Sequence, residues 1–351
     1  MHYQNDDIRI DEIKELLPPI AILERFPATE HASTTVFNAR NSIHNILARK
    51  DDRILVVIGP CSIHDPVAAL EYGQRLVKLR QQYKDQLEIV MRVYFEKPRT
   101  TVGWKGLIND PYMDNSFQLN DGLRTARKLL VDLNDAGIPT AGEFLDMITP
   151  QYVADMMCWG AIGARTTESQ VHRELSSGLS CPVGFKNGTD GTIKVAIDAI
   201  GAANAPHHFL SVTKFGHSAI VSTKGNPDCH IILRGGRTPN YSAEHVVDIA
   251  QQLTKSELLD NIMIDFSHAN SSKDYKKQMM VAEDVAGQIS QGNYAIFGVM
   301  VESHLVEGRQ DLIEGSTLCY GQSITDACIG WDDTETLLAT LNQSVLNRRK
   351  A

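Results

Sequence analysis

The sequence predicts an α/β protein, a (β/α)8 barrel of the TIM type that carries an N-terminal arm and helix and an inserted β-hairpin. Short apolar runs alternate with helical patterns along most of the 351 residues, and eight such runs follow residue 50. This length suits a closed barrel, for which roughly 250 residues are typical. An open, doubly wound sheet is the alternative, but its dinucleotide-binding form would need a GxGxxG motif after the first strand, where this chain has none.

The first expected strand lies in the run 54–64, ILVVIGPCSIH. Its apolar residues do not alternate with polar ones, which is typical of a strand that is buried on both faces. Gly59 and Pro60 mark its C-terminal end, so Cys61 comes just beyond it, where parallel barrels keep their chemistry. Taken alone, Cys61 is better interpreted as a small buried side chain, because free cysteines usually are.

Seven more strands are expected along the chain, at 88–95, 139–144, 161–166, 182–186, 229–234, 262–266 and 295–301. Helical patterns lie between them, and Asp65-Pro66 is a typical helix start. The segments 209–213 and 218–222 alternate like a hairpin, so we expect an insertion at about 208–223 ahead of the sixth barrel strand.

Residues 1–50 differ from the rest, because an acidic arm is followed by Pro18-Pro19 and then by one helical apolar stripe. We therefore expect an interface or regulatory extension over 1–50 and a catalytic barrel over 51–351.

The net charge of −9 argues against nucleic acid or an anionic membrane surface as the main partner. The longest apolar runs fall well short of the roughly 20 residues that cross a bilayer, and the N-terminus does not read as an export signal. The six cysteines show no paired spacing, which favours neither a disulfide framework nor a CxxC zinc site. We expect a cytoplasmic protein.

The C-terminal ends of the expected strands carry reactive or charged side chains one after another. In chain order they are Cys61, Arg92 with Lys97 and Arg99, Glu143, Arg165, Lys186, Arg234, His268 and Glu302. Charged side chains are rarely buried without a partner, and in a barrel these ends meet at one mouth. We therefore expect the active site there, and this convergence makes Cys61 a functional candidate.

One subset of these residues can hold a divalent transition metal, since it offers a sulfur, an imidazole nitrogen and carboxylate oxygens. Its members are Cys61, His268, Glu302 and Asp326. Such mixed ligands do not choose among zinc, iron, manganese and cobalt. The spacing does not exclude His304 as a metal ligand. The alternative to a metal site is a structural histidine in the core beside ordinary surface acids.

The second subset is cationic and suits an anionic substrate; it comprises Arg92, Lys97, Arg99, Arg165, Lys186 and Arg234. A solvated charged rim is the alternative. Together the subsets predict a barrel enzyme in which a metal polarises a carbonyl beside phosphate-binding cations. Two alternative functions are a metal-dependent hydrolase of a phosphorylated substrate and a binding protein without catalytic activity. Such hydrolases usually have a His-x-His pair on the first strand, where this chain offers only Cys61.

Five long motifs carry a resemblance to a known family: IGPCSIH (58–64), MRVYFEKPRTT (91–101), GARTTES (163–169), GFKNGTDG (184–191) and DFSHAN (265–270). They resemble the class I 3-deoxy-D-arabino-heptulosonate 7-phosphate (DAHP) synthases, and among these the bacterial phenylalanine-sensitive members, over essentially the whole chain. The resemblance implies a metal-dependent condensation of phosphoenolpyruvate with erythrose 4-phosphate and water that gives DAHP and phosphate. This reaction is the first step of the shikimate pathway to the aromatic amino acids.

The resemblance also implies residue roles. One divalent metal ion (Mn, Fe, Co or Zn) would be held by Cys61, His268, Glu302 and Asp326, and not by His304. Phosphoenolpyruvate would contact Arg92, Ala164, Arg165, Lys186 and Arg234, with Lys97 touching both substrates. Erythrose 4-phosphate would contact Lys97, Pro98, Arg99 and Thr100. Catalytic roles would fall to Lys97, Glu143, His268 and Asp326, with Glu143 orienting the attacking water.

In the same family, additions such as the arm and the hairpin build subunit contacts and a feedback site. The resemblance implies a phenylalanine pocket lined by Met147, Gln151, Ser180, Phe209, Ser211 and Val221. Asp6 and Asp7 from a neighbouring subunit's arm would close it in a homo-oligomer, a tetramer built as a dimer of dimers. The alternative is that the arm only stabilises the oligomer.

Overall fold

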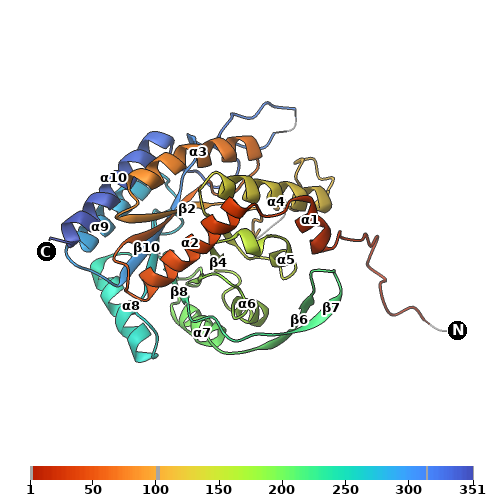
Figure 1. The fold of residues 1–351 in the computed structure, drawn as a ribbon, viewed down its shortest axis with the longest axis horizontal. Coiled ribbons are helices and arrows are strands. Elements are labelled where there is room, and N and C mark those ends of the chain that lie inside the picture. The colour runs from red at the N-terminus through yellow and green to blue at the C-terminus, as the bar shows by residue number, and fades with distance from the viewer. Residues whose placement is uncertain (1–2, 100–102, 314, 351) are drawn as a thin grey trace.

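The computed structural model describes residues 3–99, 103–313 and 315–350, and it contains the closed parallel barrel that the sequence predicts (Figure 1). Around the barrel the strands follow the order β1-β10-β9-β8-β5-β4-β3-β2. Their bounds are β1 Ile54–Gly59, β2 Leu87–Arg92, β3 Thr140–Glu143, β4 Trp159–Ile162, β5 Val183–Lys186, β8 Cys229–Leu233, β9 Ile262–Asp265 and β10 Ile296–Glu302.

Helices between the strands pack around the outside of the barrel (Figure 1). They are α3 Pro66–Gln82, α4 Leu119–Asp135, α5 Pro150–Val153 with the 3-10 turn η1 Ala154–Met156, α6 Gln170–Ser176, α7 Lys194–Ala203, α8 Ala243–Lys255, α9 Lys277–Ser290 and α10 Trp331–Arg348. The expected start of α3 is confirmed, since the Asp65 carboxylate accepts hydrogen bonds from the backbone N–H groups of Val67 and Ala68. Among the described residues, no helix combines the length and apolar content needed to cross a membrane.

The helix α2 (Glu30–Leu47) closes the end of the barrel opposite the strand C-termini. Its Arg40 donates hydrogen bonds to the backbone oxygen of Met157, just before β4, and its His44 lies 2.9 Å from the Asp228 carboxylate, just before β8. A short helix, α1 (Pro19–Arg25), precedes it. With this end covered, the opposite end is the open one.

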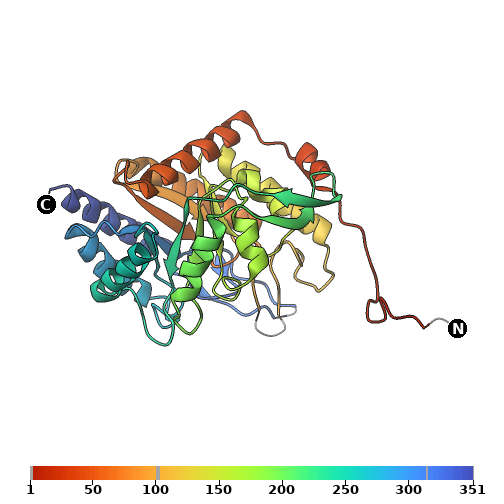
Figure 2. The same ribbon diagram turned by 90° about the horizontal axis from the view of Figure 1, so that it is seen from below.

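The predicted hairpin is formed by β6 (His208–Val212) and β7 (Ser218–Ser222), which pair antiparallel beside the barrel (Figures 1 and 2). One of its faces is strongly exposed, with Leu210 at 82% and Ile220 at 77%. In both views the described part of the N-terminal arm runs away from the barrel. A second small pair, β11 (Val306–Arg309) and β12 (Gln322–Ser323), follows the last barrel strand.

All eight barrel strands are confirmed, but two of them end several residues earlier than expected. The fourth strand was expected at 161–166, whereas β4 ends at Ile162. The backbone N–H groups of Thr166 and Thr167 donate to the Gly163 oxygen in a turn, so 163–167 is not extended. The second strand also ends earlier than expected, at Arg92. The division of the chain at residue 50 into a regulatory and a catalytic part stays a prediction.

Candidate active site

The C-terminal ends of the barrel strands surround a cavity of about 330 Å3. It gathers most of the charged strand-end residues that the sequence singled out. The predicted residues that line it are Arg92, Lys97, Pro98, Arg99, Glu143, Ala164, Arg165, Lys186, Arg234, His268 and Asp326.

Arg92 is a cation fixed inside the barrel wall, with 1% of its surface exposed. Its guanidinium donates to the backbone oxygens of Pro60 (3.1 Å) and Cys61 (3.0 Å) and to Glu302 Oε1 (3.0 Å), and it lies 3.4 Å above the Tyr94 ring centroid. Burial opposes the charged form, but Tyr94 and Glu302 outweigh burial and raise the pKa of Arg92. The charge is therefore held in place before any ligand binds.

Three more cations face the same cavity from neighbouring strands. Lys186, the last residue of β5, donates to Asp265 Oδ2 at 2.9 Å. Arg234 follows β8, and burial lowers its pKa. Arg165 is exposed, and its Nη1 donates to the Pro98 oxygen at 3.5 Å. Together they make the cavity strongly positive within an acidic protein, which suits an anionic ligand.

Cys61, Glu302 and Asp326 form a cluster of possible metal ligands, with one ligand atom from each lying within 4.8 Å of the others. Cys61 and Glu302 are buried, whereas Asp326 is exposed. Among the residues that the structure describes, this is the one group of three or more such side chains at that spacing. One thiol and two carboxylates are a donor set that transition metals accept.

The Lys97 ammonium lies among these ligand atoms, 2.8 Å from Cys61 Sγ and 2.9 Å from Asp326 Oδ2. A cation is thus already accommodated next to the cluster. Burial raises the pKa of Cys61 to about 11, and Glu302 adds to the rise although Lys97 opposes it. For Asp326, Lys97 outweighs the effect of burial and lowers the pKa. The cluster therefore fits a metal ion, whose charge would favour the thiolate.

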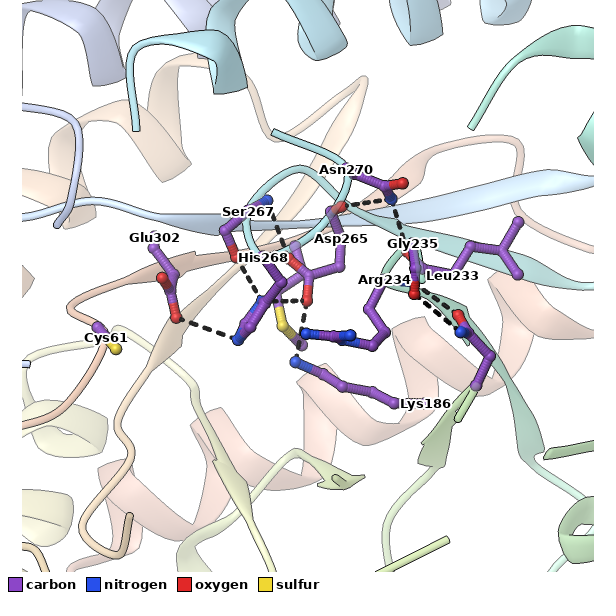
Figure 3. A network of polar contacts seen from close by, with 12 residues as sticks. Cys61, Lys186, Leu233, Arg234, Gly235, Asp265, Ser267, His268, Asn270 and Glu302 are labelled. Carbon is purple, nitrogen blue, oxygen red and sulfur yellow. Dashed lines mark hydrogen bonds and ion pairs between the residues drawn. The ribbon is translucent and has the colours of Figure 1, made fainter. Parts of the chain in front are cut away.

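His268 is not one of the three grouped ligands, but its Nε2 faces one of them, at 3.9 Å from Glu302 Oε1 (Figure 3). The other nitrogen, Nδ1, lies 2.8 Å from Asp265 Oδ2 and 2.8 Å from Ser267 Oγ. The residue has a φ of 57°, in the left-handed region, which non-glycine residues rarely adopt. Such backbone strain is typical of functional sites.

His304, which spacing alone did not exclude, has a different environment. Its Nδ1 accepts the backbone N–H of Leu305 at 2.8 Å, and its ring packs edge-on against Tyr72. Burial lowers its pKa to about 3, so it stays neutral.

Arg99 and Glu143 also line the cavity. Arg99 is exposed and donates through Nε to the Trp104 oxygen at 2.8 Å. Glu143 ends β3 and is half-buried, with its carboxylate over Gly163, where a Cβ would collide with it. Thr100 lies outside the described residues.

A second cavity, of about 390 Å3, lies between the hairpin and the barrel helices. Five of the residues expected in a regulatory pocket line it: Gln151, Ser180, Phe209, Ser211 and Val221. The sixth, Met147, lines a separate groove with Leu210 and Ile220. Asp6 and Asp7 lie exposed on the arm and do not line this cavity.

Sequence reasoning missed several residues of both cavities. Tyr94, Thr189 and Lys273 line the first one, and Arg40 and Lys214 line the second. Tyr94 was visible inside the motif MRVYFEKPRTT, but an aromatic residue there also suits the core. Arg40 and Lys214 come from a helix and a hairpin tip, whose approach to each other only the fold reveals.

Comparisons with known proteins agree with this geometry. The model of the DAHP synthetase I family matches residues 26–339. The chain is 74% identical over 349 residues to "Phospho-2-dehydro-3-deoxyheptonate aldolase, Phe-sensitive" of Escherichia coli strain K12, which covers 99% of this chain and 100% of that protein. It is 69% identical over 348 residues to the phospho-2-dehydro-3-deoxyheptonate aldolase of Haemophilus influenzae, covering 99% and 96%. The solved structure of the Francisella tularensis SCHU S4 phospho-2-dehydro-3-deoxyheptonate aldolase superposes with a TM-score of 0.95 at 52% identity, covering 97% of this chain and 99% of that one.

Proposed function

The chain belongs to the DAHP synthetase I family, and from that premise we propose how its residues carry out the family's reaction. The enzyme is a 3-deoxy-7-phosphoheptulonate synthase. It condenses phosphoenolpyruvate with erythrose 4-phosphate and water, and it releases DAHP and inorganic phosphate at the start of the shikimate pathway. One observation carries the assignment of residues: the cations line a single cavity at the barrel mouth together with His268 and Asp326, and Asp326 lies in a cluster with Cys61 and Glu302.

Phosphoenolpyruvate is bound by Arg92, Arg165, Lys186 and Arg234, with Ala164 beside Arg165. Guanidinium groups hold a phosphate or carboxylate through two parallel hydrogen bonds, and an ammonium adds a compact charge. All five residues line the same cavity, which supports the assignment. The fixed position of Arg92 lowers the entropy cost of orienting the substrate.

Erythrose 4-phosphate is bound by the segment Lys97, Pro98, Arg99 and Thr100 on the loop after β2. C3 of phosphoenolpyruvate attacks the aldehyde carbon, and the oxygen that gains negative charge takes a proton from Lys97. This role needs an ammonium close to the reacting oxygen. The position of Lys97, between Cys61 and Asp326, supports it.

One divalent metal ion (Mn, Fe, Co or Zn) is held by Cys61, His268, Glu302 and Asp326. When bound, it supplies Lewis-acid polarisation of the aldehyde carbonyl. The cluster of three ligand atoms and the free His268 nitrogen support this ligand set.

Water attacks C2 of phosphoenolpyruvate, and the phosphate leaves as its C–O bond breaks. Glu143 orients this water through its carboxylate, which reaches the cavity from the end of β3. Asp326 and His268 lie in the same cavity, where the Asp326 carboxylate accepts a proton and His268 holds one on Nδ1.

Phenylalanine is the proposed effector, in line with the printed name of the E. coli relative. The cavity of Gln151, Ser180, Phe209, Ser211 and Val221 offers apolar cover and hydroxyl contacts, and Met147 lies nearby. Asp6 and Asp7 on the arm of a neighbouring subunit pair with the ammonium in a homotetramer, a dimer of dimers. The six free cysteines suit the reducing cytoplasm in which we propose that the enzyme works.

Phosphate release from phosphoenolpyruvate, measured with and without erythrose 4-phosphate, tests the proposed function. With Mn2+ present, the aldose phosphate should be required, and one phosphate should appear per DAHP. Equal phosphate release without the aldose phosphate would indicate the alternative, a metal-dependent barrel hydrolase. No turnover under either condition would indicate a binding protein.

A further inference from the structure

Asp265, at the C-terminal end of β9, connects the two halves of the site. It is fully buried, and one carboxylate oxygen, Oδ2, accepts from Lys186 Nζ at 2.9 Å and from His268 Nδ1 at 2.8 Å (Figure 3). The other oxygen, Oδ1, accepts from the backbone N–H of Ser267 at 3.0 Å and from its hydroxyl at 2.6 Å. A candidate metal ligand and a candidate substrate-binding cation thus share one oxygen atom.

These contacts fix the state of both partners. Both carboxylate oxygens of Asp265 accept hydrogen bonds, which is the arrangement of an ionised carboxylate. An ionised acceptor at Nδ1 places a proton on that nitrogen and leaves His268 Nε2 free, turned toward Glu302. Lys186 gives Asp265 one hydrogen bond, and an ammonium keeps two more donors for an anion.

We propose that Asp265 is a positioning residue that couples metal binding to phosphoenolpyruvate binding. A cation on His268 Nε2 makes Nδ1–H a stronger donor, so Oδ2 interacts more with His268 and less with Lys186. The Lys186 ammonium then has more of its charge available for the substrate anion. Each ligand therefore raises the affinity for the other ligand by the same factor. The proposal rests on the assignment of His268 to the metal and of Lys186 to phosphoenolpyruvate.

A purely structural role makes a different prediction. If Asp265 only neutralised a buried lysine, its loss would lower stability and both affinities, but it would leave unchanged the ratio of each ligand's affinities with and without the other ligand. That ratio is the readout which separates the alternatives, because it is measured as a cycle of four binding constants.

The experiment measures the dissociation constant of Mn2+ with and without saturating phosphoenolpyruvate, and that of phosphoenolpyruvate with and without saturating Mn2+, by calorimetry on the full chain. In the native protein each ligand should tighten the other at least about 5-fold. In Asp265→Asn, Mn2+ affinity should fall about 10–100-fold, as is typical for a lost partner of a metal-bound histidine. The coupling factor should fall below about 2.

Two further variants make the test interpretable. Asn270→Ala is the matched control, since Asn270 is buried and donates to the backbone oxygens of Leu233 and Asp265, supporting the same turn without a hydrogen bond to Lys186 or His268. It should lower thermal stability and keep the native coupling factor. Ser267→Ala removes the hydroxyl that contacts both Asp265 and His268, and it should reduce the coupling partly. It stands in for Asp265→Asn if that variant does not fold.

A native coupling factor in Asp265→Asn, or in Ser267→Ala where the first variant does not fold, overturns the proposal. The same holds for a coupling factor of one in the native protein. Failure of the native protein to bind Mn2+ or phosphoenolpyruvate would instead contradict the proposed function itself.

Discussion

At the scale of single residues, Cys61 differs from the other cysteines in its surroundings. Its sulfur lies between a lysine and two carboxylates, whereas Cys181 is buried at the opposite end of the barrel. Cys61→Ala should lose bound metal and at least about 100-fold in kcat/KM, because loss of a ligand costs no less than loss of its supporting partner. Elemental analysis and DAHP formation measure this.

Cys181→Ala is the control for this substitution, since Cys181 is also free and buried. It should keep one metal ion per subunit and near-native turnover. Full metal content and normal turnover in Cys61→Ala would remove Cys61 from the ligand set.

Glu96 provides a prediction about pH. It is 6% exposed, and burial, with help from Asp146 and Glu143, raises its pKa from 4.5 to about 8. The folded protein therefore holds a proton that the unfolded chain loses above pH 4.5, so Glu96 destabilises the fold increasingly from about pH 4.5 to 8. Glu96→Gln should remove this decline, which is at most about 1.4 kcal/mol per pH unit.

Urea unfolding at several pH values between 5 and 8 checks the prediction for Glu96. Glu283→Gln, which changes an exposed carboxylate on α9, is the control and should leave the pH profile of the native protein in place. Parallel profiles for Glu96→Gln and the native protein would show that Glu96 ionises normally.

Most of the candidate site was predictable at this scale, because charged residues at the ends of apolar strands are conspicuous. Asp265 was not identified, since it ends a strand whose other residues are apolar and no local pattern shows that its carboxylate reaches Lys186, 79 residues away in the chain. Spacing also left His304 open, and only its hydrogen bond to the Leu305 backbone and its packing on Tyr72 distinguish it from His268.

At the scale of elements, Gly59 controls how closely β1 and β2 approach. A Cβ at this position would lie 2.6 Å from the backbone oxygen of Arg92, so the two strand ends would have to separate. Gly59→Ala should lower the free energy of unfolding by about 1–3 kcal/mol. It should also weaken metal binding, because Cys61 comes two residues after the end of β1 and Arg92 is the last residue of β2.

Gly201→Ala is the matched control, since Gly201 lies in α7 with nothing within 4 Å of an added Cβ. It should raise the free energy of unfolding by about 0.5–1 kcal/mol. Denaturant unfolding and Mn2+ titration measure both variants, and a Gly59→Ala protein as stable as the native one would contradict the packing argument.

The N-terminal arm carries the prediction about regulation. Residues 15–17 are tied to α4, because Asn120 accepts the Leu17 N–H and donates to the Glu15 oxygen. Deletion of residues 1–11 leaves these contacts in place, so activity should persist while inhibition by phenylalanine is lost together with Asp6 and Asp7. Inhibition curves for the truncated and full-length chains test this, and an unchanged inhibitory concentration would exclude the arm from the site.

The order of the elements was predictable because apolar runs alternate with helical stripes and residues such as Gly and Pro mark where elements begin or end. The hairpin was predictable because apolar and polar residues alternate along both of its strands. The boundaries of the fourth strand were not predictable. Gly160 interrupts its apolar run, and Gly163-Ala164 extends that run into a turn.

At the scale of the whole molecule, barrel closure accounts for the site, since it brings residues from 92 to 326 into one cavity. The eightfold alternation predicted this closure. The position of the arm relative to a neighbouring subunit could not be predicted from the pattern of one chain, because it depends on contacts between two. Met147 lines a groove beside the exposed face of the hairpin and not the cavity of the other five residues, and no local sequence pattern shows this separation.

The central claim is that a metal held at this mouth supports the condensation of the two substrates. Its most direct test is a titration of Mn2+ into chelator-treated protein, with DAHP formation followed at saturating phosphoenolpyruvate and erythrose 4-phosphate. Activity should be absent at the start, rise in proportion to bound metal and level off at one ion per subunit. Full DAHP formation by protein that elemental analysis shows to be metal-free would contradict the claim.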